Sequence, residues 1–316
     1  MFNPEQLQLL PAFTWQQRGT NPAVQQYTRF YGMDLSQEFP GLLHCFGSRK
    51  AKGGMLVMQA FLLEKNRANV FLLHGYMDHI GLYGHLIRVL LMAGYNVVAI
   101  DLPGHGLTQL GERAGIDDFQ DYQTVIKPLI AEAVTELSGT WHLVGQSTGG
   151  AIAMDYILNN PDHPFDKLVL LAPLVIPVRW PLVKFKLFTL RRFLRKVPRR
   201  FTRNSSDKAF LHFIKKHDPL QSRWVKTSWV QALYNWQPHF HNSPQSDTET
   251  LVIQGEKDIV VDWRYNLSAI SSKFTRLHKI CLPDANHHLV NEPCNIRDQV
   301  FTHLISFLQP EAKMTP

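Results

Sequence analysis

A Gly-Gln-Ser-Thr-Gly turn at residues 145–149 restricts the folds open to this chain more than any other segment. The run before it, residues 141–144, is short and mostly apolar like a buried strand, and the residues after it have a helical pattern. A turn this sharp strains the backbone of Ser147, and a Cβ atom two residues away on either side would collide with the neighbouring strand or helix. The pattern alone is weak, but in this setting it predicts that Ser147 is a nucleophile.

Short apolar runs alternate with helical patterns along most of the chain. We expect an antiparallel strand pair at 42–46 and 55–63, then strands at 69–73, 95–100, 141–144, 167–171, 250–254 and 277–281. Helices are expected at 82–93, 118–137, 263–270 and 296–308, and directly after Ser147. This order predicts an α/β fold with a mostly parallel central sheet and helices on both faces. Residues 1–35 show little periodicity and are expected to pack on this body as an extension.

The composition indicates a globular protein from a reducing compartment. The 316 residues are 45% hydrophobic, which suffices for a full core. The three cysteines, Cys45, Cys281 and Cys294, are an odd and sparse set without metal-ligand spacing. The N-terminus lacks the pattern of a signal peptide, and no run approaches the roughly 20 apolar residues of a membrane span. We therefore expect a cytoplasmic protein.

A serine hydroxyl attacks at neutral pH only when a base can take its proton and an acid orients that base. Where such a serine lies between a strand and a helix, the acid follows a late strand and precedes the histidine in the chain. Asp258 meets this requirement because it follows the expected strand at 250–254. We predict that Asp258 is the acid, with Glu256 and Asp262 as the local alternatives.

Two adjacent histidines follow the last expected strand. His287 comes directly after small turn residues, where a loop can project it over Ser147. We predict that His287 is the base and that His288 lies at the surface.

Acyl transfer also needs hydrogen-bond donors for the developing oxyanion. One is the backbone N–H of the residue after the nucleophile, which is Thr148. We assign the other to the N–H of Tyr76, in the loop that follows the strand at 69–73, with Met77 as the near alternative. His74 begins this loop and is expected to brace it by hydrogen bonds rather than to act on a substrate.

Taken together, these segments resemble the α/β-hydrolase superfamily, most of all its monoacylglycerol lipase and lysophospholipase branch, which includes serine aminopeptidase-like sequences. The segments that carry the resemblance are His74-Gly75-x-x-x-His79, Asp101-Leu102-Pro103-Gly104-His105-Gly106, Gly145-x-Ser147-x-Gly149-Gly150, Gly255-x-x-Asp258 and Ala285-x-His287 followed by Glu292. The turn at 101–106 lacks the lysine and glycine spacing of a phosphate loop, so we expect it to be structural. The resemblance implies an α/β-hydrolase fold, a Ser–Asp–His triad, ester hydrolysis through an acyl-enzyme, and no metal or organic cofactor.

Residues 177–240 lie between two expected strands, where this fold usually carries a helical cap. They contain 15 Lys and Arg residues and only two acidic residues. Their net charge is therefore +13, whereas that of the whole chain is +7. We therefore predict a hydrolase core at 1–176 and 241–316 and a basic helical cap at 177–240. Such a charge asymmetry is a clue to binding partners. Nucleic acid is not expected, because no nucleic-acid-binding module accompanies the charge.

Within the cap, residues 182–197 have the pattern of an amphipathic basic helix. Its apolar arc comprises Leu182, Val183, Leu187, Leu190, Phe193, Leu194 and Val197, and its basic arc comprises Lys184, Arg191, Arg192, Arg195 and Lys196. One interpretation places the apolar arc on the active-site cleft, and the other docks this helix on anionic lipid or steers an acidic acyl substrate. The cap aromatics Trp224, Trp229, Tyr234 and Trp236 are expected to fill the cap core rather than line an acyl pocket.

We expect a serine hydrolase that cleaves carboxylic esters of the monoacylglycerol or lysophospholipid type. Peripheral contact with the inner face of an anionic membrane through residues 177–240 is left open. An acyl thioesterase or an amidase or aminopeptidase would share the triad. A catalytically inactive binding protein on the same scaffold is the alternative from a different class.

Overall fold

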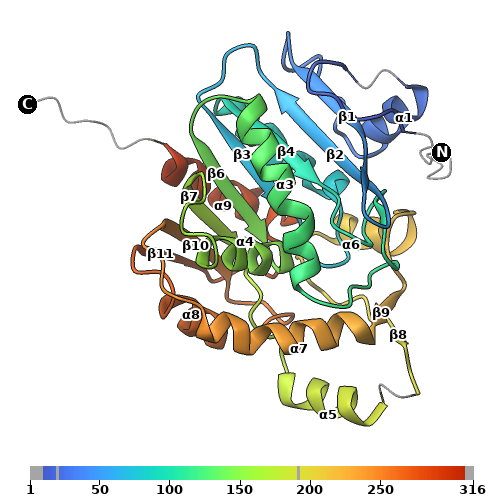
Figure 1. The fold of residues 1–316 in the computed structure, drawn as a ribbon, viewed down its shortest axis with the longest axis vertical. Helices are drawn as coiled ribbons and strands as arrows, with labels where there is room; N and C mark the ends of the chain where they lie inside the picture. Colours follow the sequence, from blue (N-terminus) through green and yellow to red (C-terminus); the bar gives the residue numbers. More distant parts are fainter. Residues whose placement is uncertain (1–9, 19–20, 191–192, 310–316) are drawn as a thin grey trace, which may run out of the picture.

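The computed structural model describes residues 10–18, 21–190 and 193–309. Within these residues nine strands form one sheet, in the order β1-β2-β4-β3-β6-β7-β10-β11 with β5 beside β2 (Figure 1). The strands are β1 (Leu43–Ala51), β2 (Gly54–Leu62), β3 (Ala68–Leu73), β4 (Tyr95–Ile100), β5 (Gln109–Leu110), β6 (Trp141–Gln146), β7 (Phe165–Leu171), β10 (Glu249–Gly255) and β11 (Leu277–Leu282). From β4 to β11 neighbouring strands are parallel, whereas β2 pairs antiparallel with β1, β4 and β5. The predicted α/β fold with a mostly parallel sheet is confirmed.

Helices cover both faces of the sheet. The helices outside the inserted segment are α1 (Pro22–Phe30), α2 (Gly84–Met92), α3 (Gln120–Glu136), α4 (Thr148–Leu158), α8 (Trp263–Ser271) and α9 (Cys294–Leu308), with short 3-10 turns at Ile80–Tyr83 and Leu289–Asn291. Phe71 and Leu73 of β3 join one apolar core with residues of α3, α4 and α8. Their neighbours Val70 and Leu72 join a second core with residues of α1, α2 and α9. The continuous apolar strands predicted from the sequence are therefore buried on both sides.

The segment between β7 and β10 carries three helices and a two-stranded sheet. Its elements are α5 (Trp180–Leu190), β8 (Lys196–Pro198), α6 (Lys208–Lys216), β9 (Trp224–Lys226) and α7 (Thr227–Asn242). Figure 1 shows α7 lying along one end of the sheet and α5 projecting beyond it. None of the helices in the described part of the chain is both long enough and apolar enough to span a membrane.

The predicted helix at 182–197 is wrong in its second half. α5 ends at Leu190, and residues 196–198 form β8, which pairs antiparallel with β9. The reason is tertiary, because Lys196 lies over the Trp224 ring at 4.5 Å and its backbone pairs with Lys226, and such pairing overrides a helical pattern. Pro198 would also interrupt a longer helix. Arg191 and Arg192 of the predicted basic arc lie outside the described residues.

A buried carboxylate joins the inserted segment to the rest of the molecule. Asp218, in the loop after α6, accepts hydrogen bonds from Tyr31 Oη at 2.8 Å, His79 Nε2 at 2.9 Å and Gln221 Nε2 at 2.8 Å. Both the Asp218 and the His79 side chains are fully buried. Burial alone would lower the pKa of His79, but the charge of Asp218 and the hydrogen bond outweigh it and raise that pKa. Three segments that are distant in the sequence therefore meet at one ion pair.

Removing the Asp218 carboxylate should destabilise the whole protein. In Asp218→Ala the buried His79 and Tyr31 side chains lose their shared partner, so we expect a loss of about 3–5 kcal/mol in the free energy of unfolding. Urea unfolding followed by circular dichroism measures this change. The exposed Asp117→Ala is the matched control and should stay within about 0.5 kcal/mol of the wild type. An Asp218→Ala midpoint equal to that of the wild type would contradict the role of this ion pair.

Candidate active site

The turn between β6 and α4 holds Ser147 in a strained conformation. Its backbone angles are φ 53° and ψ −113°, in a region that costs a residue with a side chain about 1–3 kcal/mol. A Cβ on Gly145 would lie 2.5 Å from Gly149 O, and a Cβ on Gly149 would lie 2.2 Å from Leu73 O. Both glycines are thus required by close backbone contacts, as the sequence pattern predicted. The strained turn raises the Ser147 side chain above the end of the sheet.

The structure brings Ser147, His287 and Asp258 together from the ends of three strands. His287 Nε2 lies 3.0 Å from Ser147 Oγ, and its Nδ1 lies 2.7 Å from Asp258 Oδ2. Ser147 follows β6, Asp258 follows β10 and His287 follows β11, all at the carboxyl edge of the parallel strands. In this arrangement the Nδ1–H donates to the carboxylate, which leaves Nε2 free to accept the serine proton. The two alternatives for the acid do not take this place. Glu256 is exposed, and Asp262 accepts a hydrogen bond from Tyr265 N at the start of α8.

Hydrogen bonds keep the Asp258 carboxylate ionised. Besides His287 Nδ1, its oxygens accept from the backbone N–H of Val260 at 2.7 Å, that of Val261 at 3.1 Å and Gln254 Nε2 at 3.1 Å. Burial by itself would raise the pKa of Asp258, but the charge of His287, its hydrogen bond and the N–H groups of Val260 and Val261 lower that pKa below its ordinary value. Gln254 was not recognised in the sequence, where only its spacing of four residues from Asp258 could have suggested it.

The same interaction raises the pKa of His287. Burial alone would lower that pKa, but the charge of Asp258 and its hydrogen bond outweigh burial, so the value lies above 6.5. An imidazole with a raised pKa is a stronger base for the serine proton once it is neutral.

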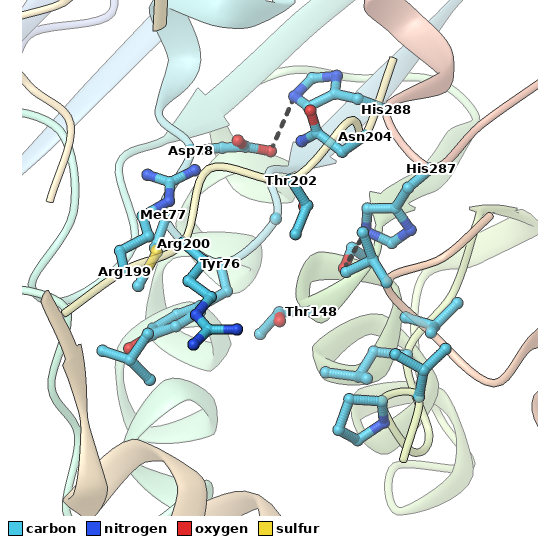
Figure 2. A pocket seen from close by; sticks show the side chains of 18 of the residues that line it. Tyr76, Met77, Asp78, Thr148, Arg199, Arg200, Thr202, Asn204, His287 and His288 are labelled. Atoms are coloured by element: carbon cyan, nitrogen blue, oxygen red, sulfur yellow. Dashed lines mark hydrogen bonds and ion pairs between the residues drawn. The ribbon is translucent and has the colours of Figure 1, made fainter. Parts of the chain in front are cut away.

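The expectation that His288 lies at the surface is wrong. His288 is buried, because residues of the inserted segment cover it, and its backbone N–H donates to Asn204 O at 2.7 Å. Its Nε2 lies 3.2 Å from Asp78 Oδ2, a contact that Figure 2 marks with a dashed line. Asp78 also accepts from Tyr83 Oη at 2.9 Å. The pair of Asp78 and His288 was missed in the sequence, where the only signal was an acidic residue in the loop after β3.

The loop after β3 is braced by hydrogen bonds, as predicted for His74. His74 Nε2 accepts from Leu102 N at 2.9 Å, so its Nδ1 carries the proton that Gly75 O accepts at 2.8 Å. The turn at 101–106 contributes through Asp101, whose Oδ1 accepts from Ile80 N at 2.8 Å. The Asp101 carboxylate thus binds backbone N–H groups, which agrees with the structural role predicted for this turn.

Tyr76 and Thr148 both line the space beside Ser147. Among the described residues neither N–H donates to a backbone carbonyl. Thr148 is the first residue of α4, where helix N–H groups lack intrahelical partners. The Tyr76 side chain is fixed by a hydrogen bond from Oη to Ala114 O at 2.7 Å and by stacking on Trp229 at 3.8 Å.

A cavity of about 440 Å³ lies over Ser147 and His287. In the described part of the inserted segment, α5, α6, α7 and β9 all supply lining residues, and most residues that line the cavity are apolar. The cap residues among them include Val178, Val183, Ile214, Val225, Trp229 and Val230. The expectation that the cap aromatics fill only the cap core is wrong for Trp229, because its ring stacks on Tyr76 at the cavity wall. Trp236 does lie in the core, where its Nε1 donates to Asp155 at 2.9 Å.

The sequence that forms this site also matches a known protein family. The family model of the serine aminopeptidase S33 hydrolases matches residues 64–294, well over half of the chain. The chain belongs to this family. The match includes Ser147, Asp258 and His287.

Named relatives and solved structures are similar to this chain. A "Probable lysophospholipase L2" of Haemophilus influenzae is 25% identical over 269 residues, which are 78% of this chain and 85% of that protein. The human monoglyceride lipase is 34% identical over 111 residues, 35% of this chain and 36% of its own length. A soluble variant of the Saccharomyces cerevisiae monoglyceride lipase, solved with a substrate analogue, has a TM-score of 0.72 at 17% identity and covers 83% of this chain and 94% of its own. The Paleococcus ferrophilus monoacylglycerol lipase has a TM-score of 0.68 at 21% identity, over 80% of this chain and 99% of its own. These structures establish the α/β-hydrolase fold.

The contact with Asp258 should set the titration of His287. In the wild type we expect His287 to titrate above pH 6.5, and in Asp258→Asn we expect its midpoint to fall, since burial alone lowers the pKa. Histidine NMR across a pH series measures the midpoint. The pH profile of any activity that needs neutral His287 should then be displaced to lower pH in Asp258→Asn. Asp262→Asn, which changes only the start of α8, is the control, and an equal shift in both variants would contradict the assignment.

Proposed function

We propose that the protein hydrolyses carboxylic esters of acyl lipids through an acyl-enzyme formed on Ser147. The observation that carries the proposal is the continuous chain from Ser147 Oγ through His287 to Asp258, at the floor of a mostly apolar cavity. Relatives named lysophospholipase and monoglyceride lipase are carboxylic ester hydrolases, and the chain is an enzyme of this class. An apolar cavity wall suits an acyl chain, because each buried CH₂ contributes about 0.8 kcal/mol.

The geometry supports two half-reactions. Ser147 Oγ attacks the carbonyl carbon while His287 Nε2 takes its proton, and Asp258 stabilises the resulting imidazolium. The N–H groups of Tyr76 and Thr148 hold the oxyanion, each contributing about 3 kcal/mol. His287 then gives the proton to the leaving alcohol, which departs and leaves the acyl group on Ser147. A water molecule repeats the sequence, with His287 as base and then as acid, and releases the fatty acid.

Thioesters and amides are the competing substrates for the same triad. The family name includes an aminopeptidase activity, and the chemistry of the acyl-enzyme is the same for all three bonds. The mostly apolar lining favours an acyl lipid over a peptide, because an acyl chain needs no hydrogen-bonding partners along its length whereas a buried peptide backbone does. Hydrolysis rates on matched esters, thioesters and amides separate these activities.

We also propose that the part of the cap formed by residues 182–190 and 193–196 rests on an anionic lipid surface. Phe185 is 66% exposed and Phe193 is 82% exposed, although large aromatic side chains are usually buried. The basic residues Lys186 and Arg195 are exposed in the same segment. Apolar side chains that enter a lipid surface between basic ones bind through buried area and through about 1 kcal/mol per basic residue.

Ser147→Ala should abolish esterase activity while preserving the fold. Loss of the nucleophile should lower kcat on p-nitrophenyl acyl esters by at least about 1,000-fold and should prevent labelling by a fluorophosphonate probe. The exposed Ser138→Ala is the control and should keep both signals. If Ser147→Ala retained full labelling and activity, another nucleophile would have to be sought. A wild type that neither labels nor hydrolyses would favour the binding-protein alternative.

Replacing the exposed aromatics should weaken membrane binding selectively. The double variant Phe185→Ser and Phe193→Ser should reduce co-sedimentation with anionic vesicles by at least about tenfold, since each buried aromatic contributes about 1.5–3 kcal/mol. Met92→Ser is the matched control because Met92 is 71% exposed but lies on α2. Equally negligible binding of the wild type to anionic and neutral vesicles would rule out this surface.

A further inference from the structure

The cap residues 199–204, which we call the strap, have no regular secondary structure, and all but Arg203 line the cavity (Figure 2). Backbone hydrogen bonds fix both ends of the strap. Arg199 N donates to Arg223 O at 2.9 Å at one end, and Asn204 O accepts from His288 N at 2.7 Å at the other. The segment that follows is held as well, because Ser206 N donates to Glu292 Oε2 at 2.7 Å. The strap is therefore a fixed part of the cavity wall, tied to the residue after His287.

Two arginines of the strap line the cavity without a carboxylate partner. Neither Arg199 nor Arg200 lies within ion-pair distance of an acidic side chain in the described part of the chain. Arg199 Nη1 donates to Gln221 Oε1 at 2.5 Å, and its guanidinium lies over the Phe201 ring at 4.5 Å. These neutral contacts orient the guanidinium, and the carboxylates of Asp78 and Asp218 attract it only from beyond ion-pair distance. Arg200 makes no hydrogen bond with the described residues, so all five of its N–H donors are available.

The other charged groups at the cavity do not neutralise the arginines. Asp78 is the one acidic side chain among the lining residues, and it lies 3.2 Å from His288 Nε2. Burial would raise the pKa of Asp78, but the charge of His288 and the hydrogen-bond donors around it lower that pKa, so it is a carboxylate. Asp258 lies behind His287, and its carboxylate is hydrogen-bonded to His287 Nδ1. Two guanidinium groups therefore face a cavity whose single lining carboxylate already contacts His288.

We propose that Arg199 and Arg200 bind the phosphate of an acylated glycerophosphate, so that the enzyme prefers lysophospholipids to uncharged monoacylglycerols. This inference rests on the proposed ester hydrolysis and adds the head group to it. Figure 2 shows both arginines across the cavity from His287, beside Tyr76 and Met77. A phosphate held there leaves the apolar lining free for the acyl chain and the ester near Ser147. Arginine suits this task because its planar fork of donors matches the oxygens of a phosphate.

The kinetic test compares two esters with the same acyl chain, one on glycerol and one on glycerophosphate, presented in the same neutral detergent micelles. The measured quantity is the ratio of kcat/KM for the phosphate ester to that for the glycerol ester. Arg200→Gln and Arg199→Gln should each lower this ratio by roughly 10- to 100-fold, because a charge-assisted hydrogen bond contributes about 1.5–3 kcal/mol. Arg200→Lys, which keeps the charge but not the fork, should fall between the wild type and Arg200→Gln.

Arg203→Gln is the matched control. Arg203 belongs to the strap but is exposed and does not line the cavity, so the ratio should not change. A ratio that is unchanged in both Arg199→Gln and Arg200→Gln would overturn the proposal. An equal loss of kcat/KM on the two esters would also overturn it, because the arginines would then support the cavity wall without binding the phosphate.

A binding test separates failure of this proposal from failure of the proposed hydrolysis. An alkyl ether of glycerophosphate has no ester bond, and its Kd for Ser147→Ala can be measured by calorimetry whether or not the wild type is active. Adding Arg200→Gln should raise this Kd by roughly 10- to 100-fold and should raise the Kd of the uncharged alkylglycerol much less. An equal rise in Kd for both ligands would overturn the proposal. So would inorganic phosphate binding as tightly as the alkyl ether of glycerophosphate, because the site would then recognise phosphate without its lipid.

Discussion

The close approach of the first turn of α4 to the end of β3 is the contact on which the site depends. Gly149 is required there because a Cβ would lie 2.2 Å from Leu73 O. With the helix this close, the chain can leave β6 only through a sharp turn, and Ser147 takes up the strain at φ 53°. The same contact sets the start of α4 beside the loop after β3. The two proposed oxyanion donors, Tyr76 and Thr148, therefore border one cavity although they are distant in the sequence.

The parallel sheet supplies the remaining constraint. Strands β6, β10 and β11 end at one edge, so the loops after them bring Ser147, Asp258 and His287 within hydrogen-bonding distance. Asp258 is held by donors from its own loop, and that arrangement fixes the orientation of His287. Burial opposes the ionised form of Asp258 and the protonated form of His287, but their mutual attraction outweighs it. The site is thus a coupled pair on a rigid frame rather than three independent side chains.

Features encoded by local patterns could be predicted from the sequence. The sheet strands are short apolar runs, and the turn at Ser147 has its own glycine spacing, so both were predictable without knowledge of the fold. Predictions were wrong or missing where a distant partner decides the conformation. Residues 196–198 form a strand because Trp224–Lys226 pair with them, and His288 is buried because residue 204 of the inserted segment covers it. The periodicity of apolar residues along the chain does not reveal contacts between such distant segments.

The strap illustrates the same limit at the site itself. Its arginines stand in a basic segment whose charge was evident from composition, but their place in the cavity depends on backbone bonds to Arg223 and His288. The boundaries of the cap at 177 and 240 stay a prediction, as does the cytoplasmic location. The family and the fold, by contrast, rest on agreement between the matched segment and the observed sheet.

The buried contact of Asp218 with Tyr31 and His79 has a consequence for how a lipid reaches the cavity. The part of the cap that contains Asp218 and the strap is fastened to the body, so lifting it would expose a charged pair that is fully buried. α5 projects from the molecule and contributes Val183 to the cavity wall, but no comparable ion pair holds it among the described residues. Displacing α5 would therefore separate no buried ion pair of the described residues, whereas displacing the part with Asp218 would separate one. The inserted segment thus has one part held by a buried ion pair and another part, α5, held by the uncharged contacts of Trp180 with Gln237 and of Phe188 with Tyr234.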